Sequence, residues 1–291
     1  METALAAIRF AHFVAAMFLF GAGLFLLVFA PRPLRAALSP RVRRWAIVAG
    51  LVAFLTALAW LAMESASMSD DWRASYDSEA VRAVLTSTSF GEVWQARIVL
   101  GVATIVALIV TRAENWRVPT LLAALWLASL GLVDHGAMQG GALGVAHRAN
   151  DSVHLLTTGG WLGGLPPFLM CLGASGAGPC RDAANVAMLR FSAVGHFAVV
   201  AILLTGAINI GLTTQALPWP PSSPYRALLA AKIGCVLVMI ALAIVNRYVL
   251  LPRVETDPRS GRILRAFALV ELGLALLVVA LVSVFGLLDP A

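Results

Sequence analysis

Eight runs of mainly apolar residues, each about as long as a membrane-crossing helix, constrain this chain more than any other feature. A helix needs about 20 such residues to cross the hydrocarbon core of a bilayer. Backbone polar groups in lipid must pair within their own segment, so each run is predicted to be helical despite its many Val and Ile residues. The predicted runs are 6–29, 45–63, 94–112, 118–135, 150–173, 188–213, 226–249 and 264–287. The sequence therefore predicts an all-α, polytopic membrane bundle that forms a single domain over residues 1–291.

The overall composition favours a membrane protein over a soluble one. Hydrophobic residues make up 60% of the chain and charged residues only 12%, whereas soluble domains carry about 25% charged residues. The net charge of +6 comes from short clusters between the apolar runs and not from one continuous basic patch. Membrane lipid is therefore expected to cover much of the surface, and nucleic acid is not an expected partner.

Several familiar signatures are absent from the sequence. It contains no Walker loop, no GxSxG elbow and no HExxH zinc motif, so we do not expect an enzyme. The three cysteines, Cys171, Cys180 and Cys235, are too scattered for a disulfide framework or a zinc ribbon. The first apolar run has neither a basic segment before it nor a small-residue cleavage site, and it is expected to be retained.

The distribution of charge predicts how the bundle is oriented. Arginines gather in or beside the connections that follow the first, third, fifth and seventh runs, namely Arg32, Arg35, Arg41, Arg43, Arg44, Arg112, Arg117, Arg181, Arg190, Arg247, Arg253, Arg259, Arg262 and Arg265. Acidic residues gather on the other side, mostly in the connection 64–93. Because cytoplasmic loops carry the Arg and Lys excess, both termini are predicted to be periplasmic. Within 64–93, residues 78–85 are predicted to form a short helix on the membrane surface.

Most histidines fall toward the predicted periplasmic end of the runs. His147, Asp151 and His154 are spaced i, i+4 and i+7, so they share one face if the helix begins by about residue 143. Imidazole and thioether side chains together suit copper, and a carboxylate is a suitable second-shell partner that orients an imidazole. The predicted metal ligands are His12, His135, His147, His154 and Met138, with Asp151 in the second shell.

Polar residues also follow a line through the predicted membrane interior. Ionisable groups inside a membrane helix are energetically unfavourable and often mark a substrate or ion pathway. Lys232 and Glu271 are expected to pair, which would offset the free-energy cost of both charges. A structural seam of hydrogen bonds between helices is an equally simple alternative to a pathway. The residues of the predicted transport path are His196, Lys232, Cys235, Met239, Asn246 and Glu271.

Four motifs, in order along residues 88–252, resemble those of the CopD/PcoD copper-resistance membrane proteins. The first stretch, residues 88–97, is similar to the pattern T-x-F-G-x-x-W-x-x-R. Residues 151–165 resemble D-x-x-H…W-x-G-G-L, and residues 190–209 resemble R-F-S…T-G…N. The fourth, residues 225–252, resembles Y-x-x-L-L-x-x-K…N-R…L-P. The order of the motifs makes the resemblance more specific than any one of them alone.

The resemblance implies a bacterial inner-membrane protein that takes copper, as Cu(I) or Cu(II), from the periplasm toward the cytoplasm. It implies that His154 and Asp151 belong to the copper site, with His12 and His135 less directly supported. It also implies a periplasmic partner, a copper chaperone of the CopC type, supplied as a separate chain. Transport by this chain remains an analogy with the family.

Two other functions remain open at this point. The chain would be a membrane electron-transfer protein if it held haem b between two histidines at similar depth. His12 with His154 or His135 is such a pair. A copper-delivery assembly factor would use the same copper site and would not transport the metal. A visible spectrum identifies the first of these, and copper uptake by vesicles separates the second from a transporter.

Overall fold

The computed structural model describes residues 1–133, 139–174, 180–214, 223–254 and 256–289, and every regular element in these ranges is helical. The elements in chain order are α1 (Glu2–Leu24), the π-helical turn η1 (Phe25–Phe29), α2 (Arg32–Ser69), η2 (Trp72–Ser75), α3 (Ser78–Ser87), α4 (Ser89–Val110), α5 (Arg117–Ala128), η3 (Ser129–Leu132), α6 (Gly141–Ala174), α7 (Arg181–Thr214), α8 (Pro224–Val245), the π-helical turn η5 (Asn246–Leu250), η6 (Leu251–Arg253) and α9 (Pro258–Phe285). The predicted all-α bundle is confirmed.

All eight predicted apolar runs lie on these helices. In the described part of the chain, seven helices are long and apolar enough to cross a membrane, and Arg117–Leu132 is a shorter apolar helix. The last residues of the predicted run 118–135 lie outside the described residues. Helix α2 begins at Arg32 rather than near residue 45, because hydropathy marks only the part of a helix that lipid covers.

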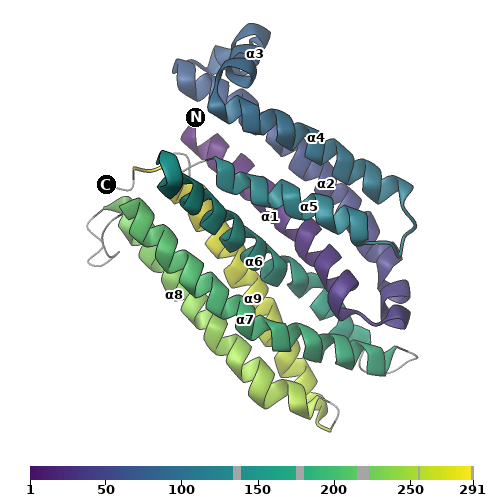
Figure 1. Ribbon diagram of the computed structural model, residues 1–291. Coiled ribbons are helices and arrows are strands. Elements are labelled where there is room, and N and C mark those ends of the chain that lie inside the picture. The colour runs from purple at the N-terminus through teal and green to yellow at the C-terminus, as the bar shows by residue number, and fades with distance from the viewer. Residues whose placement is uncertain (134–138, 175–179, 215–222, 255, 290–291) are drawn as a thin grey trace.

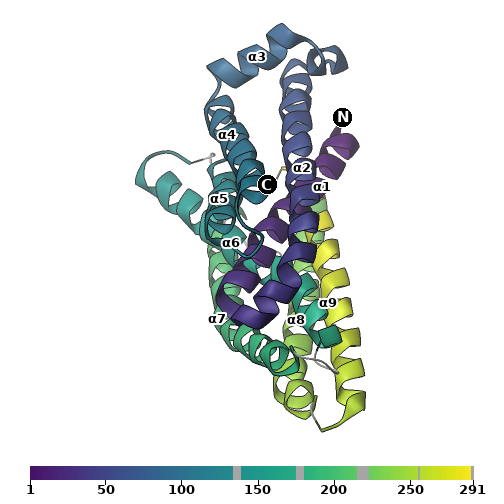
Figure 2. The same ribbon diagram turned by 90° about the vertical axis from the view of Figure 1, so that its right-hand side faces the viewer.

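Helix α1 is the centre of the bundle and contacts α2, α5, α6 and α9. It is the most deeply buried of the long apolar helices, whereas α7 and α8 are the most exposed. Figures 1 and 2 show both termini and α3 at the same end of the bundle, with the α8–α9 turn at the opposite end. This arrangement agrees with an even number of crossings and with both termini on one side.

Glycines allow α1 and α6 to pack with their backbones in contact. A Cβ atom on Gly163 would overlap the carbonyl oxygen of Met17, and one on Gly21 would overlap the carbonyl oxygen of Gly159. Small residues at such contacts are a common means of helix association in membranes. This contact fixes the position of α6, the helix that carries His147 and His154, against the centre of the bundle.

Arg43 on α2 stabilises the turn between α4 and α5. Its guanidinium group donates to the carbonyl oxygens of Leu108, Arg112 and Asn115, each at 2.9 Å. The last carbonyls of a helix have no partner within the helix, so this arginine satisfies groups that would otherwise need water. Arg43 also lies 4.9 Å from the centre of the Trp116 ring, in a cation–π contact.

The predicted helix in the connection 64–93 is present as α3, which runs across the ends of α2 and α4 (Figure 2). The Asp77 side chain accepts a hydrogen bond of 2.9 Å from the backbone N–H of Glu79 and so caps the start of the helix. Val84 is its buried residue, and most of the other side chains are exposed. Such a helix, lying across the bundle end, is suited to the membrane–water interface.

Candidate functional site

Two cavities lie at opposite ends of the part of the bundle formed by α6, α7, α8 and α9. The outer cavity, about 370 Å³ in volume, is lined mainly by residues within 147–162, 202–213, 225–237 and 278–286, together with 9–17 of α1. The inner cavity, about 230 Å³, is lined by residues within 161–168, 191–200 and 240–247, and by Glu271. The outer cavity is at the end that holds both termini, the end predicted to be periplasmic.

His147, Asp151 and His154 all line the outer cavity from one face of α6. Helix α6 begins at Gly141, early enough for the i, i+4, i+7 spacing to place them together as predicted. His147 is only 2% exposed, and His154 is half-buried. The cavity brings together two nitrogen donors and one carboxylate from a single helix.

The ring of His154 is oriented by Thr205 on α7. The Thr205 hydroxyl lies 2.8 Å from His154 Nδ1, and it donates its own proton to the Ala201 carbonyl oxygen at 2.6 Å. With its proton used there, the hydroxyl accepts from Nδ1–H of His154. The proton on Nδ1 leaves Nε2 with its lone pair, the form of imidazole that binds a metal.

Asp151 is held by a chain of amide groups from α6 and α7. Asn209 Nδ2 donates to Asp151 Oδ1 at 2.8 Å, and Asn150 Nδ2 donates to Asn209 Oδ1 at 2.6 Å. Asn150 Nδ2 also lies 2.9 Å from the carbonyl oxygen of Thr205. The carboxylate and the His154 ring are thus both positioned by the same segment of α7.

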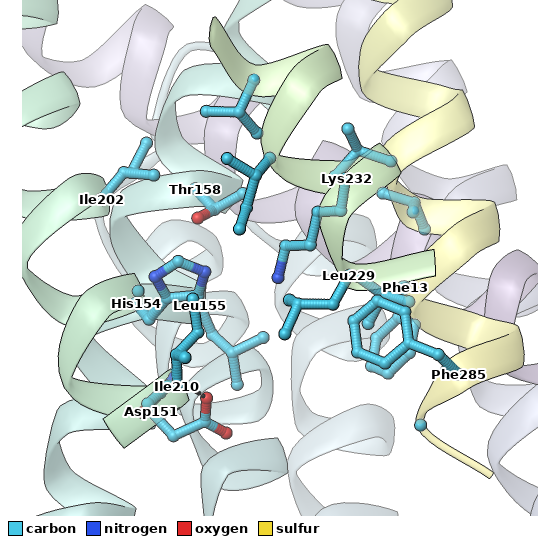
Figure 3. Close-up of a pocket in the computed structure, with 18 of the residues that line it drawn as sticks. Phe13, Asp151, His154, Leu155, Thr158, Ile202, Ile210, Leu229, Lys232 and Phe285 are labelled. Carbon is cyan, nitrogen blue, oxygen red and sulfur yellow. Dashed lines mark hydrogen bonds between the residues drawn. The ribbon is translucent and has the colours of Figure 1, made fainter. Parts of the chain in front are cut away.

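Lys232 enters the outer cavity from α8. Its Nζ atom lies 5.6 Å from the centre of the Phe285 ring, within cation–π distance. Figure 3 shows the ammonium group pointing toward the side of the cavity that holds His154 and Asp151. With Arg9 of α1, the charged groups that line the described part of the cavity are one carboxylate and two cations, and most of the remaining wall is apolar.

The structure separates His12 from the other predicted ligands. Its Nδ1–H donates to the Ala53 carbonyl oxygen at 2.9 Å, and its Nε2 accepts from the Arg97 guanidinium at 2.6 Å. The ring is fully buried among α1, α2 and α4 and does not line the outer cavity. Because both ring nitrogens are used within the protein, His12 is positioned to hold helices together, and pairing with His154 around a haem does not fit this arrangement.

Two predicted ligands, His135 and Met138, lie outside the described residues. Among the residues that the structure does describe, no three His, Cys, Asp or Glu side chains form a group that could hold a metal ion. The described part of the outer cavity therefore offers the two imidazoles and the carboxylate of α6 as separate donors.

The residues of the predicted transport path are divided between the two cavities. Lys232 lines the outer cavity, whereas His196, Asn246 and Glu271 line the inner one. The expected pairing of Lys232 with Glu271 was wrong, because Asn246 Nδ2 is the partner of Glu271, at 2.9 Å from Oε1. The position of a residue along its helix indicates its depth in the membrane but not which side chain of a neighbouring helix it contacts.

Met239 lies on α8 between the residues that line the two cavities, whereas Cys235 lies within the outer-cavity stretch of α8 but does not line that cavity. Met239 is buried, and Cys235 is half-buried. A thioether therefore occupies the segment of α8 that separates the outer from the inner cavity, and the thiol lies one helical turn before it.

Sequence reasoning missed the side chains that orient the candidate ligands. Thr205 and Asn209 occur in the motif over residues 190–209, but only the packing of α7 on α6 shows what they contact. Arg97 was also missed as a structural centre, although a charge within the run 94–112 was an available signal. Its NH1 donates to the Trp126 carbonyl oxygen at 3.0 Å and to the Ser129 hydroxyl at 2.7 Å.

Comparison with known proteins gives matches over nearly the whole chain. Residues 1–145 match the family described as copper resistance protein D-like, N-terminal domain, and residues 185–285 match copper resistance protein D. The chain is 31% identical to the inner membrane protein YebZ of Escherichia coli (strain K12), over 98% of this chain and 97% of that protein. It is 30% identical to copper resistance protein D of Pseudomonas syringae pv. tomato, over 98% of this chain and 96% of that protein. No solved structure matches the chain.

Proposed function

Because the chain belongs to the copper resistance protein D family of multi-pass inner-membrane proteins, we propose that it transports copper from the periplasm toward the cytoplasm. The family is one of copper-resistance membrane proteins and not a known enzyme family, and the proposal involves no catalysis. Copper is the transported substrate, and the outer cavity is its proposed entry site.

The observation that carries this proposal is the orientation of His154. Its Nδ1–H is donated to Thr205, so the lone pair of Nε2 is available as a ligand within the outer cavity. His147 and Asp151 on the same face of α6 supply further donors. Imidazole nitrogen suits copper in both oxidation states, and Cu(I) accepts low coordination numbers. His135 and Met138 stay in the proposal as additional ligands, and His12 leaves it.

The segment between the cavities supports a route for Cu(I). Met239 and Cys235 offer sulfur donors, which are the soft ligands that Cu(I) prefers. A copper ion that moves along α8 would pass the level of Cys235 beside the outer cavity and then that of Met239 before reaching the inner cavity. A periplasmic chaperone of the CopC type is the proposed donor of copper to the outer cavity.

Uptake of Cu(I) by proteoliposomes tests the proposal. Purified protein in liposomes that contain a fluorescent Cu(I) chelator is expected to take up external Cu(I) well above the rate of protein-free liposomes. An assembly factor that delivers copper without transporting it would give no uptake, and that result would overturn the proposal. A strong Soret band in the visible spectrum of the purified protein would favour haem instead.

Replacing Thr205 by valine is expected to weaken copper binding without removing any copper ligand. Valine keeps the shape of the side chain but cannot accept the Nδ1–H of His154, so the ring loses its fixed orientation and tautomer. Loss of such an orienting partner typically lowers metal affinity by about 10–100-fold. Competition with a chromophoric Cu(I) chelator measures the change in affinity.

Thr157→Val is the matched control for this substitution. Thr157 is on α6, the helix of His154, and its hydroxyl donates to the Val153 carbonyl oxygen at 2.8 Å, away from the outer cavity. The control is expected to bind copper like the wild-type protein. Equal affinities in the two variants would contradict the role assigned to Thr205.

A further inference from the structure

The inner cavity contains a carboxyl group that the copper proposal does not use. Glu271 on α9 is only 3% exposed, and rings such as those of Trp161, Phe168 and Phe191 form much of the cavity wall. An ionised carboxylate is strongly disfavoured in such surroundings unless a positive charge or several hydrogen-bond donors accompany it. The surroundings of Glu271 therefore indicate what this cavity binds.

The described donor to Glu271 is an amide. Asn246 Nδ2 donates to Glu271 Oε1 at 2.9 Å. Asn246 is the first residue of the π-helical turn η5, which continues α8. Turns of this kind widen a helix locally and are frequent at functional sites. Here the turn places an amide side chain against the carboxyl group of α9.

The other end of the same amide lacks a hydrogen-bond donor. Asn246 Oδ1 is buried, and within the described residues no group donates to it. An amide oxygen only accepts hydrogen bonds, and leaving one buried without a donor costs about 1–3 kcal/mol. A proton on the carboxylate would supply the missing donor, because the resulting O–H lies next to Asn246 Oδ1.

We propose that Glu271 and Asn246 form a proton-binding site at the inner end of the bundle. Uptake of one proton converts the Glu271 carboxylate into a neutral carboxylic acid, whose O–H can donate to Asn246 Oδ1 while Oε1 continues to accept from Nδ2–H. Release returns the proton to water and leaves the carboxylate with the amide as its donor. No oxidation or other bond change is involved.

The other titratable groups that line the inner cavity are already engaged elsewhere. His196 of α7 contacts the Tyr248 hydroxyl through Nε2 at 2.8 Å and the Ala193 carbonyl oxygen through Nδ1 at 3.3 Å. Arg247 of η5 donates to the Leu189 carbonyl oxygen at 3.3 Å. The α6 residues of the lining are apolar, and α1 contributes none. In the described part of the cavity, neither His196 nor Arg247 is a partner of Glu271.

A proton fits this site better than a metal cation does. Hard cations require about six oxygen ligands, whereas the described lining offers side-chain oxygens only from Glu271, Asn246 and Ser192. A proton needs one oxygen to bind and one to receive its hydrogen bond. The site has both.

Proton binding at Glu271 stands independently of copper, and its coupling to copper movement rests on the proposed function. The outer and inner cavities share α6, α7 and α8, and Met239 lies on α8 between them. A proton that binds and leaves at the inner end would give a transporter without a nucleotide-binding motif a source of energy in the proton gradient.

Infrared difference spectroscopy of the full-length protein in lipid nanodiscs tests the proton site directly. Spectra recorded between acidic and alkaline buffers in KCl are expected to show the carbonyl stretch of a protonated carboxylic acid. This band should be lost in Glu271→Gln and should shift in Asn246→Leu, because the acid then loses both of its amide contacts. The control Glu92→Gln, which changes an exposed carboxylate at the start of α4, should leave the band unchanged.

Three results would overturn the proton site. They are the absence of any acid band in the wild-type protein, a band that persists in Glu271→Gln, and a band that NaCl abolishes at constant pH, as expected if Na⁺ occupied the site. Copper uptake under an imposed pH gradient tests the coupling, and Glu271→Gln should make uptake insensitive to the gradient. An intact acid band in a protein that takes up no copper would overturn the transport proposal and leave the proton site standing.

Discussion

Replacement of both His147 and His154 by alanine is expected to lower copper affinity by more than about a hundredfold. Loss of a group that only orients a metal ligand costs about 10–100-fold, and this double substitution removes two ligands themselves. Both imidazoles line the outer cavity from α6, so their removal enlarges an existing cavity and should leave the helix packing in place. Competition with a Cu(I) chelator measures the affinity, and thermal unfolding in detergent verifies the fold.

The pH dependence of binding provides a second measurement on the same variant. Protons compete with copper for the lone pair of an imidazole, so wild-type affinity should fall as the pH is lowered. The double variant should lose most of this dependence together with its affinity.

His196→Ala is the matched control, because His196 is an exposed imidazole at the inner cavity with Tyr248 as its partner. The control should bind copper like the wild-type protein. If the double variant bound copper with wild-type affinity, the outer cavity would not be the copper site. Only the fold and the family assignment would then stand.

Periodicity along a single helix was sufficient to predict the arrangement of His147, Asp151 and His154. The three residues are neighbours on α6, so their common face follows from helix geometry once the helix begins at Gly141. The same holds for the long apolar helices and for α3, because hydropathy and capping are local properties of the sequence. These features required no knowledge of how the helices pack.

Contacts between helices could not be predicted in the same way. His12 was assigned to the copper site from its depth and from the family resemblance, but its partners Ala53 and Arg97 are 41 and 85 residues away in sequence. Thr205, the partner of His154, is 51 residues away, on α7. Which face of each helix meets its neighbour depends on packing across the whole bundle. A single sequence indicates how deep a residue lies in the membrane, but not toward which neighbouring helix its side chain points.

The hydrogen bonds of Arg97 are the clearest case of such packing, and Arg97→Met is expected to destabilise the protein by about 1–3 kcal/mol for each buried acceptor that loses its donor. Arg97 is fully buried and donates to His12 Nε2, to the Trp126 carbonyl oxygen and to the Ser129 hydroxyl. Its guanidinium carbon also lies 4.8 Å from the centre of the Trp94 ring. Methionine fills much of the space but donates no hydrogen bond, so His12 Nε2 and the Ser129 hydroxyl lose a donor, whereas the Trp126 carbonyl oxygen keeps the Ser129 hydroxyl at 2.7 Å.

Thermal unfolding in detergent measures this loss, and the melting temperature should fall by on the order of 10 °C. Arg82→Ala, which removes an exposed arginine from α3, should leave the melting temperature near the wild-type value. Copper affinity of the folded Arg97→Met protein should be close to wild type, since Arg97 does not line the outer cavity.

A double-mutant cycle with His12→Phe identifies the part of this effect that belongs to the Arg97–His12 contact. Phenylalanine retains a ring between Trp60 and Trp126, the two indoles whose ring centres lie 5.9 and 6.0 Å from that of His12. Once His12 is gone, Arg97→Met no longer leaves Nε2 without a donor, so the double variant should lose less stability than the two single variants together. Additive losses would show that the two side chains act separately. A large loss of copper affinity in His12→Phe with the fold intact would instead return His12 to the copper site, contrary to the hydrogen bonds that occupy both of its nitrogens.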